Sequence, residues 1–366
     1  MSFADTVSVE EPVLERPFVS VLMPVRNEAS FIERSVGSVF AQDYPRDRME
    51  ILIADGGSND ATREVSESLK QSHPDISITL LDNPGKIVAT GLNAALRQAK
   101  GEVIVRVDGH CEIAPDYVRR CVGHLLNDDV EAVGGPVETI GESYIARVIA
   151  AAMSSWFGVG GSAFRVAHSR TQLTDTVAFP AYTRAVIQRA GPFDEELVRN
   201  QDDEYNYRLR KLGVKILLAS DVRSRYYSRA TLTGLCSQYF QYGYWKVRVM
   251  QKHPRQMRLR QFAPPLFVAA LLAVLLALPI TPVARYLAAT TAGGYAIALI
   301  GASILAARKN KWQSLPLLPI AFTILHLAYG LGFLIGLVRF WNRWGQSRSK
   351  SQSRAPIPDV DKYERI

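Results

Sequence analysis

Three long stretches without a charged side chain lie near the end of this chain, at residues 263–280, 286–307 and 315–338. They are 18, 22 and 24 residues long, and a helix needs about 20 apolar residues to cross a bilayer. The second and third stretches predict membrane spans. The first is short and flanked by prolines, so it is compatible with spanning, tilting or re-entering. Buried core helices are the alternative, but three such stretches in succession with basic flanks favour a membrane region at 263–340.

The net charge of +8 is confined to the same part of the chain. Residues 246–354 hold 15 Lys or Arg and no Asp or Glu, and the remainder holds 28 basic against 35 acidic residues, a net of −7. Basic flanks on apolar segments indicate contact with membrane lipids, and no nucleic acid partner is expected. Residues 246–262 are expected to form a basic interfacial helix along the anionic inner leaflet, which would place the domain before it beside a lipid-linked acceptor.

The positions of the basic residues give conflicting indications of the orientation in the membrane. Basic residues stand before the first apolar stretch, between the second and third, and after the third. Basic flanks favour the cytoplasmic side, whereas three complete spans would place the tail outside. One alternative is that the basic tail lies outside despite its charge. The other is that one of the three stretches does not cross the membrane, and we expect this to be the first. Under both alternatives the protein is multi-pass in the cytoplasmic membrane, with the preceding domain on the cytoplasmic side.

Residues 17–245 alternate short β-type runs with helix-type stretches. The expected elements are 19–23, 29–41, 50–54, 60–71, 76–81, 86–99, 103–107 and 115–126. This alternation predicts an α/β fold with a mainly parallel sheet covered by helices. Ligands of such sheets bind beyond the carboxyl ends of the strands. Residues 1–16 and 341–366 are predicted to be flexible tails, the second of them basic.

Composition excludes two broad classes of protein. With 48% hydrophobic residues the chain is too apolar for intrinsic disorder. Its three cysteines make no disulfide framework, and its first sixteen residues contain no apolar core of a signal peptide. An ordinary secreted protein is therefore not expected.

Polar side chains follow several of the expected strands. The first strand is followed by Pro24, Val25, Asn27 and Glu28. The second is followed by Asp55 and the sequence Gly-Gly-Ser-Asn-Asp-Ala-Thr. Helix capping accounts for residues 58–62 but not for Asp55. An acid that ends an apolar strand is costly unless a ligand donates to it, and a nucleobase imide or a ribose hydroxyl would do so.

Asp108 and His110 follow the fourth strand with one residue between them. A carboxylate and an imidazole at this spacing can face one divalent cation, and their oxygen and nitrogen donors suit Mn²⁺ or Mg²⁺. Such a cation would neutralise a departing diphosphate. A hydrogen bond between the two side chains in a turn is the alternative.

Three acids in succession, Asp202, Asp203 and Glu204, open a predicted helix. A favourable interaction with the helix dipole explains them, or one of them projects into the cleft as a general base. A cation and a positioned carboxylate together are what direct displacement at a sugar carbon requires.

In their order and spacing, these motifs resemble the inverting family-2 glycosyltransferases, which have the GT-A fold. The resemblance covers about residues 17–245 and includes Gly191-Pro-Phe-Asp-Glu195 and Arg208-Leu209. Within the family the chain is most similar to bacterial exopolysaccharide glucosyltransferases of the succinoglycan type, which carry C-terminal membrane segments. The resemblance implies a Rossmann-like sheet, a nucleotide-sugar donor and a divalent cation, Mn²⁺ or Mg²⁺.

The resemblance also implies roles for individual residues. Pro24, Val25, Asn27 and Glu28 would line the nucleotide cleft. Asp55 would hold the uracil or the ribose of the donor. Asp108 would contact the ribose or the cation. His110, which replaces the second acid of the family's Asp-X-Asp triplet, would bind the cation.

The expected base follows from the family's Glu-Asp motif, in which the Asp lies six residues before the Arg of an Arg-Leu pair. Counting back from Arg208 selects Asp202 as the general base, with Asp203 as the second choice. Gln201 stands where the family has its Glu.

Three further residues are candidates for substrate contacts. Arg229 lies where the family often places a basic residue that contacts the diphosphate, and a solvated arginine is the alternative. Trp245 would stack on an acceptor sugar or anchor the chain at the membrane surface. It belongs to a match to the Gln-X-X-Arg-Trp signature of processive synthases that lacks the Arg, so processivity is not expected. Lys86 and the glycine-rich loop 158–161 are expected mobile elements of the cleft.

The expected activity is transfer of a hexose, with UDP-glucose as donor, to a polyprenyl-diphosphate-linked saccharide in cell-surface or exopolysaccharide synthesis. Synthesis of a polyprenyl-phosphate hexose in the same donor cleft is the nearest enzymatic alternative. A non-catalytic, nucleotide-sugar-binding scaffold subunit is an alternative from a different class. A transporter is disfavoured, because the apolar stretches contain one polarised residue, His326, and no paired polar residues.

Overall fold

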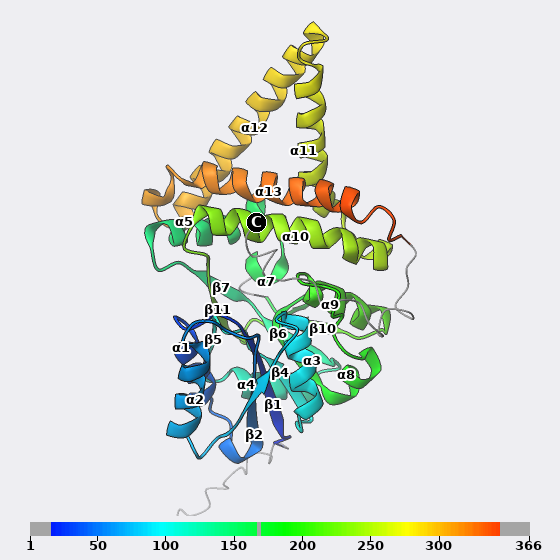
Figure 1. Cartoon of the computed structure of the whole chain (residues 1–366). Helices are drawn as coiled ribbons and strands as arrows, with labels where there is room; N and C mark the ends of the chain where they lie inside the picture. Colours follow the sequence, from blue (N-terminus) through cyan, green and yellow to red (C-terminus); the bar gives the residue numbers. More distant parts are fainter. Residues whose placement is uncertain (1–15, 167–169, 345–366) are drawn as a thin grey trace, which may run out of the picture.

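The computed structural model of the chain describes residues 16–166 and 170–344. An α/β domain forms one end of the molecule, and a group of long helices lies against it (Figure 1). Two of these helices project away from the domain as a hairpin (Figure 1). The predicted tails lie outside the described residues, except for Arg16 and residues 341–344.

The domain is built on an eight-stranded sheet with the order β3-β2-β1-β4-β9-β6-β10-β8. Its strands are β1 (Val19–Val25), β2 (Met49–Asp55), β3 (Ser77–Asp82), β4 (Val103–Arg106), β6 (Ala132–Gly135), β8 (Gln172–Leu173), β9 (Ala178–Thr183) and β10 (Ile216–Leu218). The pairs β3–β2, β2–β1, β1–β4 and β6–β10 are parallel, whereas β9 runs antiparallel to β4 and β6, and β8 to β10. The prediction of a mainly parallel α/β sheet is confirmed.

The domain contains helices on the large sheet and others beside the C-terminal helices. They are α1 (Ile32–Phe40), η1 (Arg46–Arg48), α2 (Thr62–Ser72), α3 (Val88–Gln98), α4 (Tyr117–Asn127), α5 (Tyr144–Met153), α6 (Trp156–Val159), α7 (Ala163–Val166), α8 (Arg184–Ala190) and α9 (Gln201–Lys211). The strands β1 and β2 are buried along their whole length, which explains why they are apolar runs without alternation. The helix α1 buries Ile32, Val36 and Val39 on one face, as helical periodicity requires.

A second, three-stranded sheet is absent from the sequence-based expectations. It consists of β5 (Cys111–Ile113), β11 (Ser224–Tyr227) and β7 (Val137–Ile140), in the order β5-β11-β7. These strands are three or four residues long and come from distant parts of the chain, so periodicity gives little signal for them. The sheet matters because it brings Tyr226 beside the residues that follow β4.

Four long helices make up the C-terminal part: α10 (Leu232–Lys252), α11 (Leu259–Ala277), α12 (Pro282–Lys309) and α13 (Leu318–Arg339), with short turns η2 (Pro254–Gln256) and η3 (Trp312–Ser314) between them. The helices α11, α12 and α13 correspond to the three predicted stretches and are long and apolar enough to cross a membrane. In Figure 1, α11 and α12 form the projecting hairpin, and α13 lies alongside α10 across its base. The structure has no boundary at 245/246: α10 runs through it, and residues 246–262 are not a separate helix.

Glycines allow α13 to lie close against α10. A Cβ atom on Gly332 would collide with the carbonyl oxygen of Phe240, and one on Gly243 would collide with the carbonyl oxygen of Tyr329. Gly336, one turn further along α13, meets the backbone of α10 in the same way. Small residues four apart on one helix face let two backbones approach closely. This face of α13 is therefore shaped to pack against protein.

The variant Gly332→Ala is expected to destabilise the chain by about 1–3 kcal/mol, the usual cost of overpacking a tight contact. The atom it meets belongs to the backbone of α10 and cannot rotate away. Gly301→Ala in α12 is the matched control, because nothing lies within 4 Å of its Cβ position, and it should be neutral or stabilising. Thermal unfolding of both full-length variants in detergent measures the difference. Equal midpoints would contradict the contact between α10 and α13.

Candidate active site

The loops after β1 and β2 are hydrogen-bonded to one another at the carboxyl edge of the sheet. The backbone N–H of Asn27 donates to the Ser58 hydroxyl (2.9 Å), and the side-chain oxygen of Asn27 accepts from the N–H of Asn59 (3.0 Å). The N–H of Glu28 donates to the Thr62 hydroxyl (2.7 Å). Asn27 has a φ of 54°, which asparagine adopts more readily than most residues. The two loops therefore form one connected unit.

Asp55 ends β2 inside this unit. Its Oδ1 atom accepts hydrogen bonds from the N–H and the hydroxyl of Ser58 (3.1 and 2.6 Å), and its Oδ2 atom lies 3.7 Å from Nη1 of Arg63. The turn itself therefore satisfies half of the carboxylate, and the role of Asp55 as a donor-binding residue stays a prediction. The backbone of Lys86 lies beside the turn after β2, because its carbonyl oxygen is 3.2 Å from the Cβ position of Gly56.

Pro24 and Val25 are the last two residues of β1, and both are buried. A Cβ atom on Gly109 would lie 3.2 Å from Cγ1 of Val25. The end of β1 therefore contacts the loop after β4. This contact joins the β1–β2 unit to Asp108 and His110, as predicted from the positions of the strand ends.

The carboxylate of Asp108 is held by Arg106, the last residue of β4. Nε and Nη2 of Arg106 donate to the two oxygens of Asp108 at 2.7 and 2.9 Å, a bidentate pair that fixes the carboxylate in one orientation. Arg106 is 7% exposed. The sequence analysis did not assign a function to Arg106, although an arginine within a four-residue strand of otherwise apolar residues was a signal for one.

His110 is paired with Glu28. Its Nδ1 atom lies 2.8 Å from Oε1 of Glu28, and its ring lies edge-on to Tyr226 with the centroids 5.1 Å apart. Burial lowers the pKa of His110, but the Glu28 carboxylate outweighs burial and raises the pKa to about 9. Glu28, predicted only as a wall of the nucleotide cleft, thus also orients His110.

Asp108 and His110 fit a cation whose ligand set a substrate diphosphate would complete. A carboxylate on one ring nitrogen is the usual arrangement behind a metal-binding imidazole, and it directs the other nitrogen outward. Because the raised pKa keeps the ring protonated at neutral pH, a cation would bind by displacing the proton of that other nitrogen. Asp108 has lone pairs beyond those that Arg106 occupies. The residues described here contain no group of three His, Cys, Asp or Glu side chains that would hold a metal alone. Phosphate oxygens and water commonly supply the remaining ligands of Mg²⁺.

The first turn of α9 carries the two candidate bases, and their environments differ. Burial raises the pKa of Asp202; the charge of Arg106 opposes this, while those of Asp203 and Asp108 add to it, and the pKa lies above its ordinary value. The charges of Arg106 and Asp108 therefore both act on the carboxyl group of Asp202. The carboxylate of Asp203 is instead bound by Lys246, a side chain that is 5% exposed.

A row of ion pairs, which we call the seam, joins α9 and the loop before it to α10. Its pairs are Asp203–Lys246, Glu196–Arg248, Asp194–Lys252 and Glu204–His253. Further along, Arg258 lies 2.9 Å from Asp175. The basic residues expected to lie along the inner leaflet thus face acids of the domain. Arg208 secures the same loop by donating to the carbonyl oxygens of Ala190 and Pro192 (2.6 and 2.9 Å).

Two arginines lie near Tyr226, on the other side of His110. The guanidinium of Arg165 lies 5.5 Å from the centroid of the Tyr226 ring and donates to the hydroxyl of Thr139 (3.3 Å). Burial raises the pKa of Tyr226, but the positive charges of His110, Arg229 and Arg165 lower it below its ordinary value. Arg229 is exposed. The sequence analysis missed Arg165, which follows the glycine-rich loop.

Trp245 is not part of this arrangement. Its side chain is 4% exposed and packs edge-on against Tyr244 and at a tilt against Phe340. Both expected roles for Trp245, stacking on an acceptor sugar and anchoring at the membrane surface, require an exposed ring. The structure corrects them: Trp245 belongs to the packing between α10 and the end of α13.

Comparison with known proteins identifies relatives over most of the chain. The model of glycosyl transferase family 2 matches residues 20–184. The succinoglycan biosynthesis protein ExoA of Rhizobium meliloti (strain 1021) is 32% identical over 336 residues, which cover 88% of this chain and 96% of that protein. A dolichyl N-acetyl-alpha-D-glucosaminyl phosphate 3-beta-D-2,3-diacetamido-2,3-dideoxy-beta-D-glucuronosyltransferase of Methanococcus voltae is 26% identical over 328 residues, 88% of this chain and 98% of that protein.

A solved structure shares the fold. The mannosyltransferase PcManGT from Pyrobaculum calidifontis, in complex with GDP-Man and Mn²⁺, has a TM-score of 0.56 and 24% identity, covering 85% of this chain and 87% of that one. This likeness supports a GT-A-like domain followed by C-terminal helices. The full-length similarity to a known relative and the family match over the sheet establish the family: the chain belongs to glycosyltransferase family 2 and is a glycosyltransferase.

Proposed function

We propose that this glycosyltransferase transfers glucose from UDP-glucose, with inversion, to a lipid-linked saccharide in exopolysaccharide or cell-surface synthesis. The observation that carries the proposal is the convergence of Asp202 with the Arg106–Asp108 pair beyond the carboxyl ends of the strands. The Rhizobium relative is named for succinoglycan biosynthesis. The Methanococcus relative is named for a dolichyl-phosphate-linked sugar. The first name supports a role in exopolysaccharide synthesis, and the second supports a lipid-linked acceptor.

The donor binds along the connected loops. Oδ2 of Asp55 has one long contact, to Arg63, and it receives the uracil imide or a ribose hydroxyl. The ends of β1 and the loop after it, with Pro24, Val25 and Asn27, form the wall of the nucleotide cleft. Arg165 and Arg229, whose charges act on Tyr226 beside His110, provide positive charge toward the diphosphate, and Lys86, whose backbone lies against Gly56, is a further basic residue of the cleft.

Asp108 and His110 would hold a divalent cation, Mn²⁺ or Mg²⁺, which would supply positive charge against the departing diphosphate. Asp202 accepts the proton of the acceptor hydroxyl. The hydroxyl oxygen attacks the anomeric carbon on the face opposite the nucleotide, and the bond from that carbon to the diphosphate breaks with its electrons leaving on the diphosphate. The raised pKa of Asp202 makes it a stronger base than an ordinary aspartate. Arg106 fixes the orientation of Asp108 throughout.

The helices support a hairpin that crosses the membrane twice and a third helix that does not cross. In α11 and α12, 11% and 6% of the apolar window is buried by protein, against 44% in α13. The domain is tied to the start of α11 and to both ends of α13 by the pairs Arg258–Asp175 (2.9 Å), Tyr144–Gln313 (2.7 Å) and Arg343–Glu196 (3.2 Å). A helix with both ends on one domain cannot cross a bilayer.

The same arrangement removes the orientation conflict in the sequence. The start of α11, the end of α12 and the described residues after α13, with the basic residues Arg258, Lys309 and Arg343, lie at the base of the hairpin, next to the domain (Figure 1). Basic flanks favour the cytoplasm, so the domain and the end of α13 are both cytoplasmic. The non-crossing stretch is then the third and not the first. Its outer face carries an apolar stripe for the bilayer: Ile320, Leu327, Leu331, Ile335 and Val338 are 37–76% exposed.

Asp202→Asn is expected to lower the transfer rate about 10²–10⁴-fold, the usual contribution of a general base, with donor binding retained. The assay uses purified full-length protein in detergent, bacterial lipid extract as acceptor, labelled UDP- and GDP-sugars, and Mn²⁺, Mg²⁺ or EDTA. A lipid-extractable glucosylated saccharide that requires the cation and is lost in the variant supports the proposal. A product that is only a polyprenyl-phosphate hexose would overturn the acceptor, and unchanged transfer by the variant would overturn the base.

Asp203→Asn separates the two candidate bases. Asp202 acts as a base only when deprotonated, so the rate falls as the pH drops through its pKa. Removal of the Asp203 charge lowers that pKa, so the acid limb of the pH–rate profile should move to lower pH while the plateau stays within about tenfold of wild type. The double variant Asp203→Asn/Lys246→Met removes both partners of a buried pair and controls for an unpaired lysine. If the plateau rate of either variant falls as far as the rate of Asp202→Asn, Asp203 is the base.

Labelling with a membrane-impermeant maleimide tests the hairpin. Thr281→Cys at its tip, in a Cys236→Ser background, should be labelled in intact cells, because it would reach the outer face. Asn342→Cys after α13 should be labelled only after permeabilisation. The wild-type chain, which retains the exposed Cys236 at the start of α10, is the cytoplasmic control. Labelling of Asn342→Cys in intact cells would instead make α13 a third span.

A further inference from the structure

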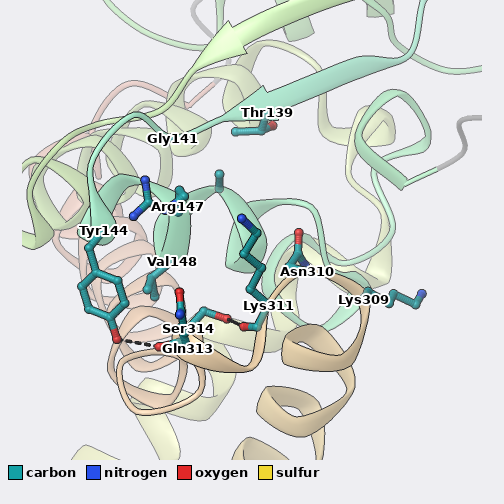
Figure 2. Close-up of a pocket in the computed structure, with 11 residues that line it drawn as sticks. Thr139, Gly141, Tyr144, Arg147, Val148, Lys309, Asn310, Lys311, Gln313 and Ser314 are labelled. Atoms are coloured by element: carbon teal, nitrogen blue, oxygen red, sulfur yellow. Dashed lines mark hydrogen bonds between the residues drawn. The ribbon is translucent and has the colours of Figure 1, made fainter.

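A cavity of about 340 Å³ lies between the α/β domain and the connection from α12 to α13 (Figure 2). Its lining comes from β7, α5 and the residues around η3: Thr139, Gly141, Tyr144, Arg147, Val148, Ala150, Lys309, Asn310, Lys311, Gln313 and Ser314. The volume is at the small end of the range for ligand pockets, which is about 300–1,000 Å³. It has room for a headgroup but not for a long prenyl chain.

The cavity is basic. Arg147, Lys309 and Lys311 line it, and none of its lining residues is an acid. Among the described residues, no carboxylate forms an ion pair with any of the three: the nearest acid in sequence, Glu142, pairs through its carboxylate with Arg34 at 2.7 Å. The basic residues of α10, in contrast, are neutralised by the seam. This positive charge is therefore available to an anion.

Two of the three basic side chains that line the cavity point in directions that would let them bind such an anion. Figure 2 shows Lys311 extending from the connection toward Thr139, with Arg147 on one side and Asn310 on the other, while Lys309 points away. Arg147 donates through Nη1 to the carbonyl oxygen of Glu142 (2.9 Å), which leaves its other guanidinium N–H groups for a ligand. The hydroxyl of Tyr144 donates to the carbonyl oxygen of Gln313 (2.7 Å) and closes one end of the cavity.

The position of the cavity suits a lipid headgroup. Its outer wall is the end of α12 and the turn that leads into α13, which is the base of the projecting hairpin (Figure 1). With the proposed topology, this base lies at the level of the cytoplasmic phosphates of the bilayer.

The inner wall of the cavity leads to the active site. Thr139 lines the cavity and accepts a hydrogen bond from Arg165 (3.3 Å). Arg165 lies over the ring of Tyr226, and that ring contacts His110. Thr139 is also the register partner of Tyr226 in the small sheet. One strand pair therefore separates the cavity from the residues that flank the donor diphosphate.

We infer that this cavity binds the diphosphate of the lipid-linked acceptor, with Arg147 and Lys311 as its principal contacts. The saccharide then extends past Thr139 and Arg165 toward Asp202, and the prenyl chain enters the bilayer beside α12 and α13. The inference rests on the proposed function. The phosphate of an ordinary anionic phospholipid has the same charge chemistry, so the experiment compares the two sources.

The test uses full-length protein in detergent and the double variant Arg147→Glu/Lys311→Glu, with Arg255→Glu as the matched control. Arg255 is an exposed arginine of η2, outside the cavity. Native mass spectrometry measures the Kd of a polyprenyl diphosphate, alone and with excess phosphatidylglycerol. The KM values for lipid-linked acceptor and for donor are measured on the same samples, and thermal unfolding checks that each variant folds.

We expect the double variant to raise the Kd and the acceptor KM about tenfold or more, as loss of charge-assisted contacts does, with the donor KM unchanged. Arg255→Glu should change neither value, and phosphatidylglycerol should not compete. Equal effects of the double variant and the control would overturn the site. Competition by phosphatidylglycerol at similar concentration would make it a phospholipid site and overturn the acceptor assignment. Failure of the proposed function is distinguishable, because wild-type protein would then transfer no sugar to any lipid.

Discussion

The seam between α9 and α10 is the interaction on which the arrangement of this molecule depends. Its side chains are between 1% and 26% exposed, and removing one partner of so buried a pair leaves a charge that costs several kcal/mol. The helix α10 cannot move away from α9 without unpairing four such pairs. Because α10 is in turn packed along α13, the seam fixes the position of Asp202 relative to the long C-terminal helices. The proposed lipid-linked acceptor would require the proposed base to stand at such a fixed position.

The seam also shows the limit of counting charges along a sequence. The excess of basic residues after 246 was correctly located, but the sequence does not show which acids face them. Lys246, Arg248 and Lys252 point at acids about 40 to 60 residues earlier in the chain, and pairing over such distances has no local pattern. Apart from β5, the strands and α-helices up to residue 127 were predictable, because each is a local apolar run or an amphipathic stretch. The small sheet, with strands of three or four residues, was not.

Hydropathy has a related limit in the membrane region. The apolar window of α13 has the highest mean hydropathy of the three long helices, 2.0, yet α13 is the one most covered by protein. Apolar composition reports that a helix avoids water and does not report what covers it. The distinguishing signal lies in the small residues: Gly332 and Gly336 meet the backbone of α10, and Gly330 meets that of α11. Glycines with such contacts on a helix face indicate a close protein neighbour.

Arg106 shows why the candidate site was only partly predictable. Asp108 and Asp202 were both selected from the sequence, but as members of separate motifs with separate roles. In the structure a single guanidinium on β4 binds Asp108 in a bidentate pair and opposes the effect of burial on the pKa of Asp202. The strand β4 lies between β1 and β9 in the interior of the sheet, so Arg106 has little freedom to move. The two carboxylates therefore do not act as independent groups. A positively charged group that binds Asp108 competes with Arg106 for that carboxylate. Any displacement of Arg106 in turn changes the basicity of Asp202.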